Sequence, residues 1–291
     1  MTKKIRVYGI VQGVGFRPTV SRHASAAGIT GNVCNKGPYV EIFAEGSEEC
    51  VHSFIKQIQE EPPKRAVILK LDVENVESGE DGIHKVESET DSKEKFQIIE
   101  SEKEEGEIFV SPDIAICPEC KKELYDKNDR RYLHPFINCT CCGPRLTILD
   151  SMPYDRVRTS MGEFPMCEKC EYEYTHAETR RFDAQPVCCN DCGPEVYLLG
   201  RKERGADAIR YTRKVISEGG IVAVKGIGGF HLCCDAAKEE TVARLRQRKK
   251  RPMKPFAVMM KDLDVVRREC ETEPHLEEIL DGHQKPIILL P

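Results

Sequence analysis

Apolar and polar positions alternate over residues 4–11, where β-branched side chains are also frequent, so this stretch predicts a β-strand. A glycine-rich turn follows the strand. Small and apolar residues then recur at helical spacing through Val20, Ala24 and Ala27, and Gly28 ends the pattern. The pattern therefore predicts a strand, a turn and a helix at the start of the chain.

Two further strands are predicted at residues 29–35 and 39–46, on either side of a short turn. Ser47 is a typical helix N-cap, and the helix after it carries an apolar face that consists of Val51, Phe54, Ile55 and Ile58. Residues 66–76 and 96–101 predict additional strands. The order strand–helix–strand–strand–helix–strand is that of a ferredoxin-like sandwich, an α+β fold.

A change in charge marks the end of this first domain. Residues 87–107 contain nine acidic residues against three lysines and little that could form a core, which indicates an exposed segment. We assign residues 1–92 to the first domain, 93–111 to an acidic linker with the final strand, 112–200 to a cysteine-rich module and 201–291 to a third domain.

Eight of the fifteen cysteines form four C-x-x-C pairs, namely Cys117/Cys120, Cys139/Cys142, Cys167/Cys170 and Cys189/Cys192. Adding 50 to the first four residue numbers gives the last four, so the module is an internal repeat. Four thiolates suit one tetrahedral zinc ion in each repeat. Because a closed shell of four ligands leaves no position for a substrate, we expect two structural zinc ions.

The neighbours of these pairs leave some alternatives open. Cys141 and Cys188 adjoin ligands and could replace them, although the repeat favours the paired cysteines. His134 and His176 do not recur at the repeat distance, which argues against a role as ligands. A nucleic-acid-binding finger is a further alternative, but no basic helix follows the cysteines at finger spacing.

The third domain begins with residues 219–232, which predict a strand and a glycine turn, and a helix containing Val242 and Leu245 follows. Residues 244–254 carry seven positive charges, which either bind phosphate or form a solvated face. The chain ends in a predicted strand over KPIILLP, so we expect this domain to be incomplete at its carboxyl end.

A candidate phosphate site lies in GIVQGVGFRP, residues 9–18, at the junction of the first strand and helix. Glycines and backbone N–H groups at such a junction can form an anion-binding nest. Arg17 can donate two hydrogen bonds to phosphate oxygens, and Asn35, at the end of a later strand, could hold a water molecule. A glycine-rich turn with one arginine is by itself more often structural.

Composition narrows the class of protein. The chain of 291 residues is 40% hydrophobic and 32% charged, as in globular proteins. Its net charge of −5 gives no general attraction to nucleic acid or anionic membranes, and no apolar run of about 18 residues predicts a membrane span. Cysteines in C-x-x-C pairs in a chain of this length indicate zinc in a reducing cytoplasm rather than disulfides.

The first domain resembles acylphosphatase over about residues 4–92, through the string G-x-V-Q-G-V-x-F-R and the later G-x-V-x-N. The resemblance implies hydrolysis of acyl phosphates without a metal, with Arg17 and Asn35 as catalytic residues and Asn35 orienting the water. It implies a phosphate-binding loop of Gln12, Gly13, Val14, Gly15 and Phe16. Cys34 departs from the family, which often has arginine before the asparagine.

The segments RRYLHPFINCT, LTILDSMPYDR and RRFDAQP between the cysteine pairs resemble the HypF family. GGIVAVKGIGGFHLCCDA and LRQRKKRPMKPFAVMM resemble its YrdC-like domain, which implies a nucleotide- and carbamate-binding site at Lys225, Gly228, Gly229, His231, Lys249, Arg251 and Lys254. Members of this family are carbamoyltransferases of nickel–iron hydrogenase maturation. The resemblance implies hydrolysis of carbamoyl phosphate, activation of carbamate with ATP and magnesium, and transfer to a HypE acceptor through domains beyond these 291 residues.

Other functions stay open at this point. A zinc-organised scaffold whose phosphate loop has lost its activity and a general acylphosphatase both fit the same motifs. RNA binding is a minor alternative, because the basic run in the third domain has no interleaved aromatic residues for base stacking.

Overall fold

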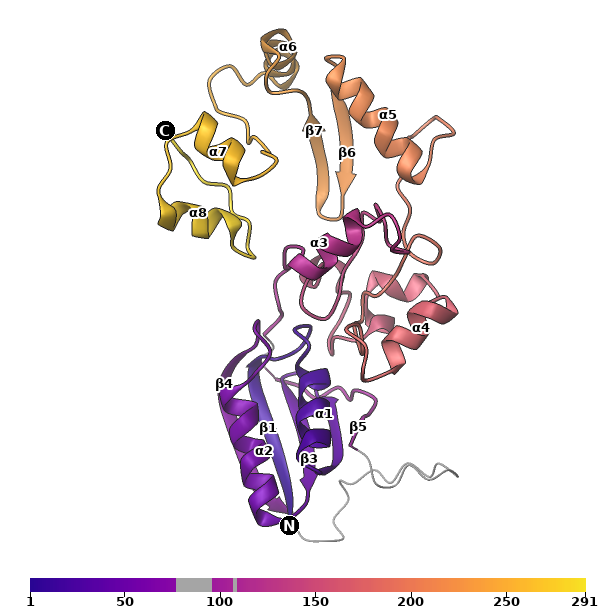
Figure 1. The fold of residues 1–291 in the computed structure, drawn as a ribbon, viewed down its shortest axis with the longest axis vertical. Coiled ribbons are helices and arrows are strands. Elements are labelled where there is room, and N and C mark those ends of the chain that lie inside the picture. Colours follow the sequence, from indigo (N-terminus) through magenta and orange to yellow (C-terminus); the bar gives the residue numbers. More distant parts are fainter. Residues whose placement is uncertain (77–95, 107–108) are drawn as a thin grey trace. The chain divides into compact units, whose positions relative to one another are not determined.

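The computed structural model describes residues 1–76, 96–106 and 109–291, in two compact units, residues 1–193 and 194–291. Of the acidic segment 87–107, only residues 96–106 are among the described residues. Within the described ranges, no helix combines the length and apolarity that a membrane crossing requires. Figure 1 shows the elements along the chain.

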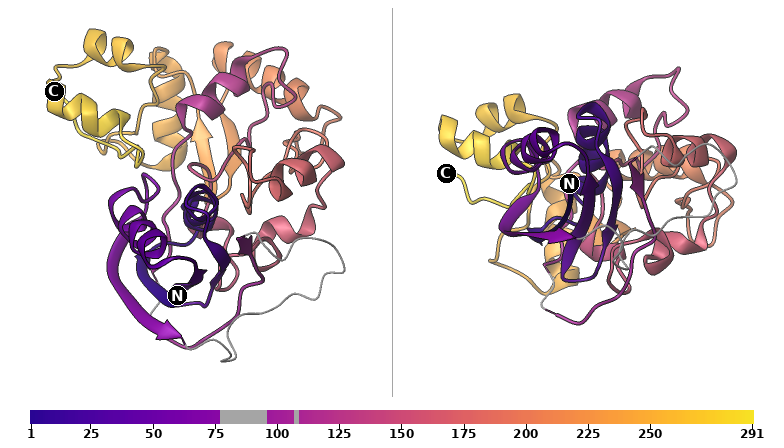
Figure 2. Two further views of the ribbon diagram at one scale, coloured as in Figure 1. Left: turned by 60° about the horizontal axis from the view of Figure 1, so that its bottom comes forward. Right: turned by 90° about the horizontal axis from the view of Figure 1, so that it is seen from below.

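The first unit opens with a five-stranded sheet and two helices, formed by β1 (Thr2–Ile10), α1 (Phe16–Ala26), β2 (Thr30–Asn35), β3 (Tyr39–Glu45), α2 (Glu48–Glu60), β4 (Val67–Val76) and β5 (Gln97–Ile98). The strand order is β4-β1-β3-β2-β5, with β5 parallel to β2 and all other neighbours antiparallel. Figure 2 shows this sheet and its helices from two further directions. The predicted ferredoxin-like sandwich is confirmed.

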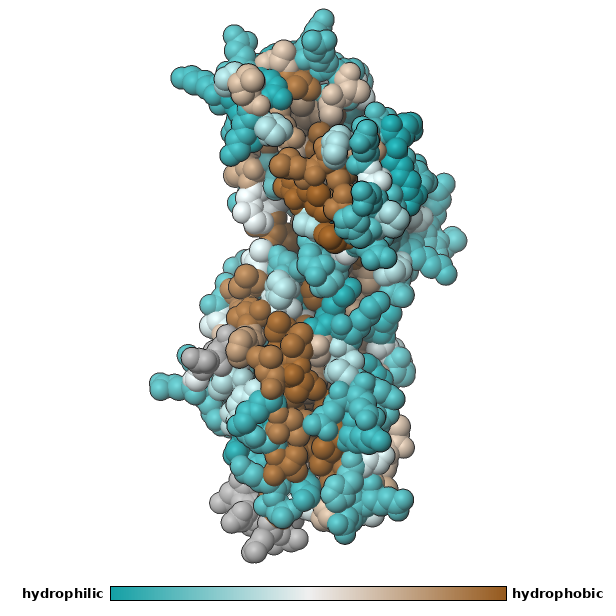
Figure 3. All heavy atoms as spheres, turned by 90° about the vertical axis from the view of Figure 1, so that its left-hand side faces the viewer, coloured by the Kyte–Doolittle hydropathy of each residue, from teal (hydrophilic) through white to brown (hydrophobic). Residues whose placement is uncertain are grey.

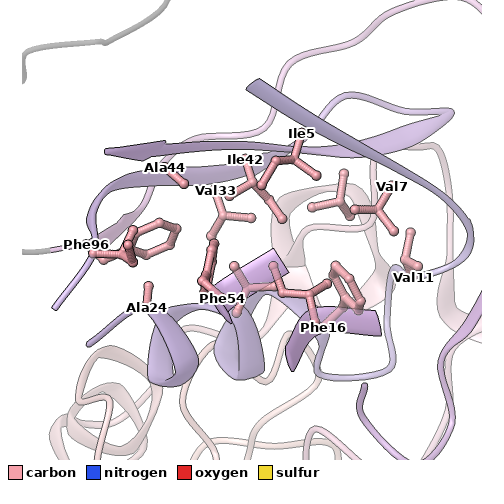
Figure 4. Packing of buried hydrophobic residues seen from close by; sticks show 14 of the residues in the cluster. Ile5, Val7, Val11, Phe16, Ala24, Val33, Ile42, Ala44, Phe54 and Phe96 are labelled. Carbon is pink, nitrogen blue, oxygen red and sulfur yellow. The ribbon is translucent and has the colours of Figure 1, made fainter. Parts of the chain in front are cut away.

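The core of this sandwich lies between the sheet and the two helices (Figure 4). Ile5 and Ile42 from the sheet meet Phe16 and Phe54 from the helices, and none of the four is more than 2% exposed. Burial of each such side chain contributes about 1.5–3 kcal/mol. Phe96, just before β5, packs its ring 6.1 Å from that of Phe54 between centroids, so the chain after the undescribed segment returns to the same core.

Strand β4 lies at one edge of the sheet and exposes apolar side chains. Val67, Leu69 and Val73 are 47%, 59% and 40% exposed. The apolar surface on the face drawn in Figure 3 is rimmed by polar residues.

The cysteine-rich module contains short elements, namely α3 (Pro118–Tyr125), three 3₁₀ turns at Leu146–Ile148, Arg156–Arg158 and Ser160–Glu163, and α4 (Glu168–Thr175). Cys117 and Cys167 occupy the N-cap positions of α3 and α4. The repeat extends to the backbone, because Leu133 and Asp183, fifty positions apart, both adopt left-handed conformations, with φ of 52° and 56°. The predicted internal repeat is confirmed in three dimensions.

The second unit contains a hairpin and four helices, namely α5 (Gly205–Ser217), β6 (Val222–Gly226), β7 (Gly229–Cys233), α6 (Glu239–Lys249), α7 (Leu263–Glu269) and α8 (Pro274–Asp281). The predicted strand and helix correspond to β6 and α6, but a second strand, β7, lies between them. The strand predicted over KPIILLP is wrong, because residues 285–291 have no regular structure here. A strand needs a neighbour to pair its backbone, and none lies beside this segment in the described second unit.

Candidate active site and metal centres

The glycine-rich loop between β1 and α1 requires glycine at two positions. Gly13 and Gly15 have φ of 71° and 78°, a left-handed conformation that side-chain-bearing residues rarely adopt. Gly15 is the residue before α1, so the loop ends at the positive end of the helix dipole. This geometry can present backbone N–H groups to an anion.

Arg17, in the first turn of α1, is buried and held by two carboxylates of the cysteine-rich module. Its Nη1 lies 3.1 Å from Asp155 Oδ1, and its Nε lies 3.1 Å from Asp183 Oδ2. Nη1 also donates to Ser101 Oγ at 3.1 Å. Burial acts to lower the pKa of Arg17, but Asp183 and then Asp155 outweigh it and raise that pKa above its usual value. The guanidinium therefore stays charged inside the protein.

Asn35, at the end of β2, reaches the same place as Arg17. Arg17 Nη2 and Asn35 Nδ2 both donate, at 3.5 Å, to the backbone carbonyl of Tyr154. Asn35 Oδ1 is buried and has no hydrogen-bond partner within the described structure. The predicted catalytic pair thus converges, and one polar atom of the pair is left to accept a hydrogen bond.

The side chain of Gln12 makes two hydrogen bonds that hold the loop in place. Its Nε2 donates to Gly37 O at 2.7 Å, and its Oε1 accepts from Tyr154 N at 3.3 Å. Val14 and Phe16 are buried in the hydrophobic core, so only their backbone could serve a ligand. The loop therefore offers backbone groups and Arg17 rather than its other side chains.

A cavity of about 310 Å³, including its open mouth, lies beside the loop. Residues 11–18 of the first domain line one side, apart from Val14. The cysteine-rich module supplies the other side, with Thr140, Arg145, Tyr154, Asp183, Ala184, Gln185 and Pro186. The candidate site is therefore built from both parts of the first unit.

Arg145 contributes a second buried guanidinium to this cavity. Its side chain donates to the carbonyl of Gly13 in the loop and to four carbonyl oxygens of its own module, those of Cys139, Thr140, Cys142 and Pro144. Because C=O and N–H point in opposite directions across a trans peptide, a held Gly13 carbonyl turns the Val14 N–H away from Arg145. Arg145 thus fixes one peptide of the loop.

Burial and, to a smaller extent, the nearby Asp155 together raise the pKa of Asp183 to about 6, against the opposing effect of Arg17. Asp183 Oδ1 also accepts from Gln185 Nε2 at 2.8 Å, so the carboxylate is fixed on two sides. Asp183 and Asp155 therefore hold the same guanidinium, that of Arg17.

The eight paired cysteines form two clusters, one in each repeat, and the sulfur atoms within each cluster lie within 4.8 Å of one another. Neighbouring sulfurs are 3.7 and 3.8 Å apart in the first cluster. A tetrahedral zinc ion with Zn–S bonds of about 2.3 Å requires sulfurs about 3.8 Å apart, so the geometry fits zinc. Each ligand set comes from within one repeat, and neither Cys141 nor Cys188 replaces a paired cysteine.

Arginines cross from each repeat to the cluster of the other. Arg130 Nη2 donates to Cys170 Sγ at 3.1 Å, and Arg180 Nη1 donates to Cys120 Sγ at 3.3 Å. Arg130 also forms an ion pair with Glu173, and Arg180 forms one with Glu123. Glu123 is the residue that corresponds to Glu173 in the first repeat. The positive charges of one repeat thus offset the thiolates of the other.

Three family models match the chain: "Acylphosphatase" over residues 3–97, "HypF finger" over residues 116–149 and 166–199, and "Telomere recombination" over residues 214–290. The probable carbamoyltransferase HypF of Methanocaldococcus jannaschii is 48% identical over all of this chain. A solved structure of full-length HypF in a phosphate- and nucleotide-bound form is 45% identical over 99% of the chain, with a TM-score of 0.89. The chain belongs to the HypF family.

The likeness covers about a third of those HypF proteins, because the chain spans 37% of the M. jannaschii protein and 37% of the solved HypF chain. An acylphosphatase of Caldivirga maquilingensis is 46% identical over 80 residues, which are 27% of this chain and 83% of that protein. The HypF-type chain therefore contains an acylphosphatase domain, two four-cysteine fingers and a third domain that the telomere-recombination model matches.

In the second unit, the predicted nucleotide- and carbamate-binding residues fall into two groups. Lys225, Gly228, Gly229 and His231 lie on the β6–β7 hairpin, where the Lys225 ammonium stands 5.1 Å from the centre of the Phe230 ring. The second group, Lys249, Arg251 and Lys254, lies at and beyond the end of α6. Within the fully described second unit, no hydrogen bond or ion pair joins the two groups. They remain predicted site residues.

Sequence reasoning missed the residues that the cysteine-rich module adds to the acylphosphatase loop. Arg145, Tyr154, Asp155 and Asp183 lie more than a hundred residues from that loop along the chain. One signal was available: Asp183 occupies the position of Leu133 in the other repeat, so a charged residue replaces an apolar one inside an otherwise similar unit.

Proposed function

We propose that this chain hydrolyses carbamoyl phosphate to carbamate and phosphate, as the first step of a HypF-type carbamoyltransferase. The observation that supports it best is the convergence of Arg17 and Asn35 beside the glycine loop, 3.5 Å from one shared acceptor. Relatives named as a carbamoyltransferase and an acylphosphatase match this chain, and the acylphosphatase family model covers residues 3–97. An acyl phosphate has a good leaving group, so positioning and charge neutralisation can supply most of the rate enhancement.

In this proposal, the backbone N–H groups of the loop and Arg17 bind the phosphoryl oxygens. Asn35 Oδ1, buried without a partner in the described structure, accepts a hydrogen bond from the attacking water. The oxygen of water bonds to phosphorus as the bond between phosphorus and the carbamoyl oxygen breaks. Carbamate leaves with the bonding electrons, and the proton of the water passes to the phosphate or to solvent.

We further propose one zinc ion in each four-cysteine cluster, held by Cys117, Cys120, Cys139 and Cys142 or by Cys167, Cys170, Cys189 and Cys192. A closed thiolate shell suits a structural role, since metal binding supplies folding free energy on the order of 10 kcal/mol to small modules. Eight of the fifteen cysteines gather in these two clusters, which favours a reducing compartment such as the cytoplasm.

The later steps belong to this proposal only for a longer protein. The family implies that carbamate is activated with ATP and magnesium at the third domain, and that a HypE-type partner receives the carbamoyl group. The predicted residues of that site are Lys225, Gly228, Gly229 and His231 on the hairpin and Lys249, Arg251 and Lys254 at and beyond the end of α6. The division into an acylphosphatase domain (1–92), a linker (93–111), a finger module (112–200) and a third domain (201–291) is likewise proposed.

Phosphate release from carbamoyl phosphate by the purified chain tests the first step. We expect activity that Arg17→Ala abolishes, because the phosphoryl charge then has no guanidinium beside the loop. Arg22→Ala is the matched control, since Arg22 is an exposed arginine on the same helix. Activity that survives in the Arg17 variant, or that is equally low in both variants, would contradict the proposal.

A further inference from the structure

The acylphosphatase loop does not form a complete pocket from its own domain. Half of the cavity wall comes from the finger module, and one carboxylate on that wall, that of Asp183, contacts Arg17. A substrate whose phosphoryl group is held by Arg17 would therefore lie within reach of Asp183. The acyl group is the part that distinguishes one acyl phosphate from another.

We propose that Asp183 is a specificity-determining residue of this site and accepts a hydrogen bond from the amino group of carbamoyl phosphate. The inference rests on the proposed function. Asp183 lines the cavity, and its side chain is only 11% exposed. A carboxylate can accept about four hydrogen bonds, and Arg17 and Gln185 supply two.

The chemistry of the substrates makes this carboxylate selective. Carbamoyl phosphate carries two N–H donors where acetyl phosphate carries a methyl group. A buried acceptor that meets a methyl group loses a hydrogen bond it would have made with water, and that loss is costly. Sites built to hydrogen-bond a substrate N–H reject analogues that lack it far more strongly than apolar pockets reject an extra methyl group.

Asp155 offers an internal comparison. It contacts the same guanidinium at the same distance of 3.1 Å, but it is not among the residues that line the cavity. Asp155 therefore acts only by positioning Arg17, whereas Asp183 both positions Arg17 and faces the substrate. A comparison of Asp155 variants with Asp183 variants therefore separates the positioning of Arg17 from recognition of the substrate.

Asp183 adopts a left-handed conformation, with φ of 56°, and this restricts the variants that test the idea. Asparagine tolerates that conformation and keeps the shape of the side chain, and glycine removes the side chain without backbone strain. We therefore choose Asp183→Asn and Asp183→Gly, with Asp155→Asn as the positioning control. Glu163→Gln serves as a control for charge loss at an exposed site of the same module.

The experiment measures kcat/KM of the full chain for carbamoyl phosphate and for acetyl phosphate. We expect both Asp183 variants to lower the carbamoyl-to-acetyl ratio by tenfold or more. Asp155→Asn should lower both values together and leave the ratio within about twofold, and Glu163→Gln should change neither value. Thermal unfolding and metal content identify any variant that fails to fold. If one Asp183 variant fails to fold, the ratio measured for the other Asp183 variant tests the proposal.

An unchanged ratio in a folded Asp183 variant overturns the specificity role, even where both activities fall. This outcome differs from failure of the proposed function, in which the unmodified chain hydrolyses neither substrate or Arg17→Ala keeps its activity. A ratio that falls equally in Asp155→Asn also overturns the proposal, because positioning of Arg17 alone would then explain the selectivity.

Discussion

Arg17 and Asn35 lie eighteen residues apart and meet at one atom, the carbonyl oxygen of Tyr154, to which each donates a hydrogen bond of 3.5 Å. Arg17 comes from α1 and Asn35 from the end of β2, so the sandwich fold brings them together. The acceptor belongs to the finger module. The first domain therefore brings the two side chains together, and the finger module supplies the carbonyl that both contact.

The first prediction concerns Asn35. Asn35→Ala should lower kcat for carbamoyl phosphate by about a hundredfold or more and change KM little, because the amide orients water rather than binding the phosphoryl group. Steady-state phosphate release measures both constants. Asn32→Ala is the comparison, since Asn32 is also buried in β2 but does not contact Tyr154 in the described hydrogen-bond network. A rise in KM without loss of kcat would assign Asn35 to substrate binding instead.

The sequence predicted the sandwich well because its elements carry local signals. The alternation over β1, the cap at Ser47 and the apolar face of α2 each depend on a few neighbouring residues. These signals act within about ten residues, where backbone conformation and capping are decided. The cysteine clusters were predictable for a different reason, since the spacing of the ligand pairs and their repetition at an offset of 50 residues can be read directly from the sequence.

The other half of the site could not be predicted, because it depends on how two modules pack. Arg145 contacts Gly13 and Asp155 contacts Arg17, each across more than 120 residues of chain, and no periodicity encodes such contacts. A buried guanidinium such as that of Arg17 needs hydrogen-bond acceptors. The finger module supplies them as Asp155 and Asp183. Strand β7 was missed because it begins at Gly229, within the glycine-rich stretch that predicted a turn.

The second prediction concerns the arginines that cross between the repeats. Arg180→Met should weaken zinc binding at the first cluster by about 10- to 100-fold, because groups that hydrogen-bond metal ligands tune affinity by this amount. The effect falls on the repeat that does not contain Arg180. Competition with a chromogenic chelator measures the affinity of each site. Lys127→Met removes an exposed charge from the same module and should leave both affinities unchanged.

The reciprocal contact, from Arg130 to Cys170, gives the equivalent prediction for the second cluster. Arg130→Met should weaken the second cluster in the same way, since Arg130 contacts Cys170. If each variant instead weakened the cluster of its own repeat, the crossed arrangement would be wrong. Equal losses at both sites would indicate general unfolding, which far-ultraviolet circular dichroism would detect.

The third prediction concerns removal of the metal. Chelation of zinc should abolish hydrolysis of carbamoyl phosphate although no proposed zinc ligand touches the phosphate loop. The reason is that Asp155 and Asp183, which hold Arg17, belong to a module whose folding depends on the metal. Activity and the exchange of backbone amides should be followed together during chelation. The sheet of the first domain should keep its protection from exchange, since its core contains no cysteine ligand.

Restoration of zinc supplies the control for this experiment. Activity should return with the protection of the finger module, at the same zinc concentration. Full activity in the metal-free chain would show that the finger module does not complete the site. Loss of protection in the sheet as well would show that the two parts of the first unit unfold together.

The fourth prediction concerns pH. His134 is only 1% exposed and bonds to Asn190 Oδ1 at 3.0 Å through one ring nitrogen, while the other lies 3.3 Å from Cys188 Sγ. Burial, with nearby arginines, lowers the pKa of His134 to about 4 from the usual 6.5. The unfolded chain therefore binds a proton between these values that the folded chain does not. Stability contributed by neutral His134 is present above pH 6.5 and is lost as pH falls toward 4.

The size of this effect is on the order of 3 kcal/mol across that interval. His134→Gln should therefore flatten the dependence of unfolding free energy on pH between 6.5 and 4, as measured by urea titrations at fixed zinc concentration. His176→Gln is the matched control, because His176 is exposed. Zinc affinity also decreases as the pH falls, but it does so in the unmodified chain and in both histidine variants. The difference between the two variants therefore reports on His134 alone. Identical slopes for both variants would show that His134 takes up its proton in the folded state as readily as in the unfolded chain.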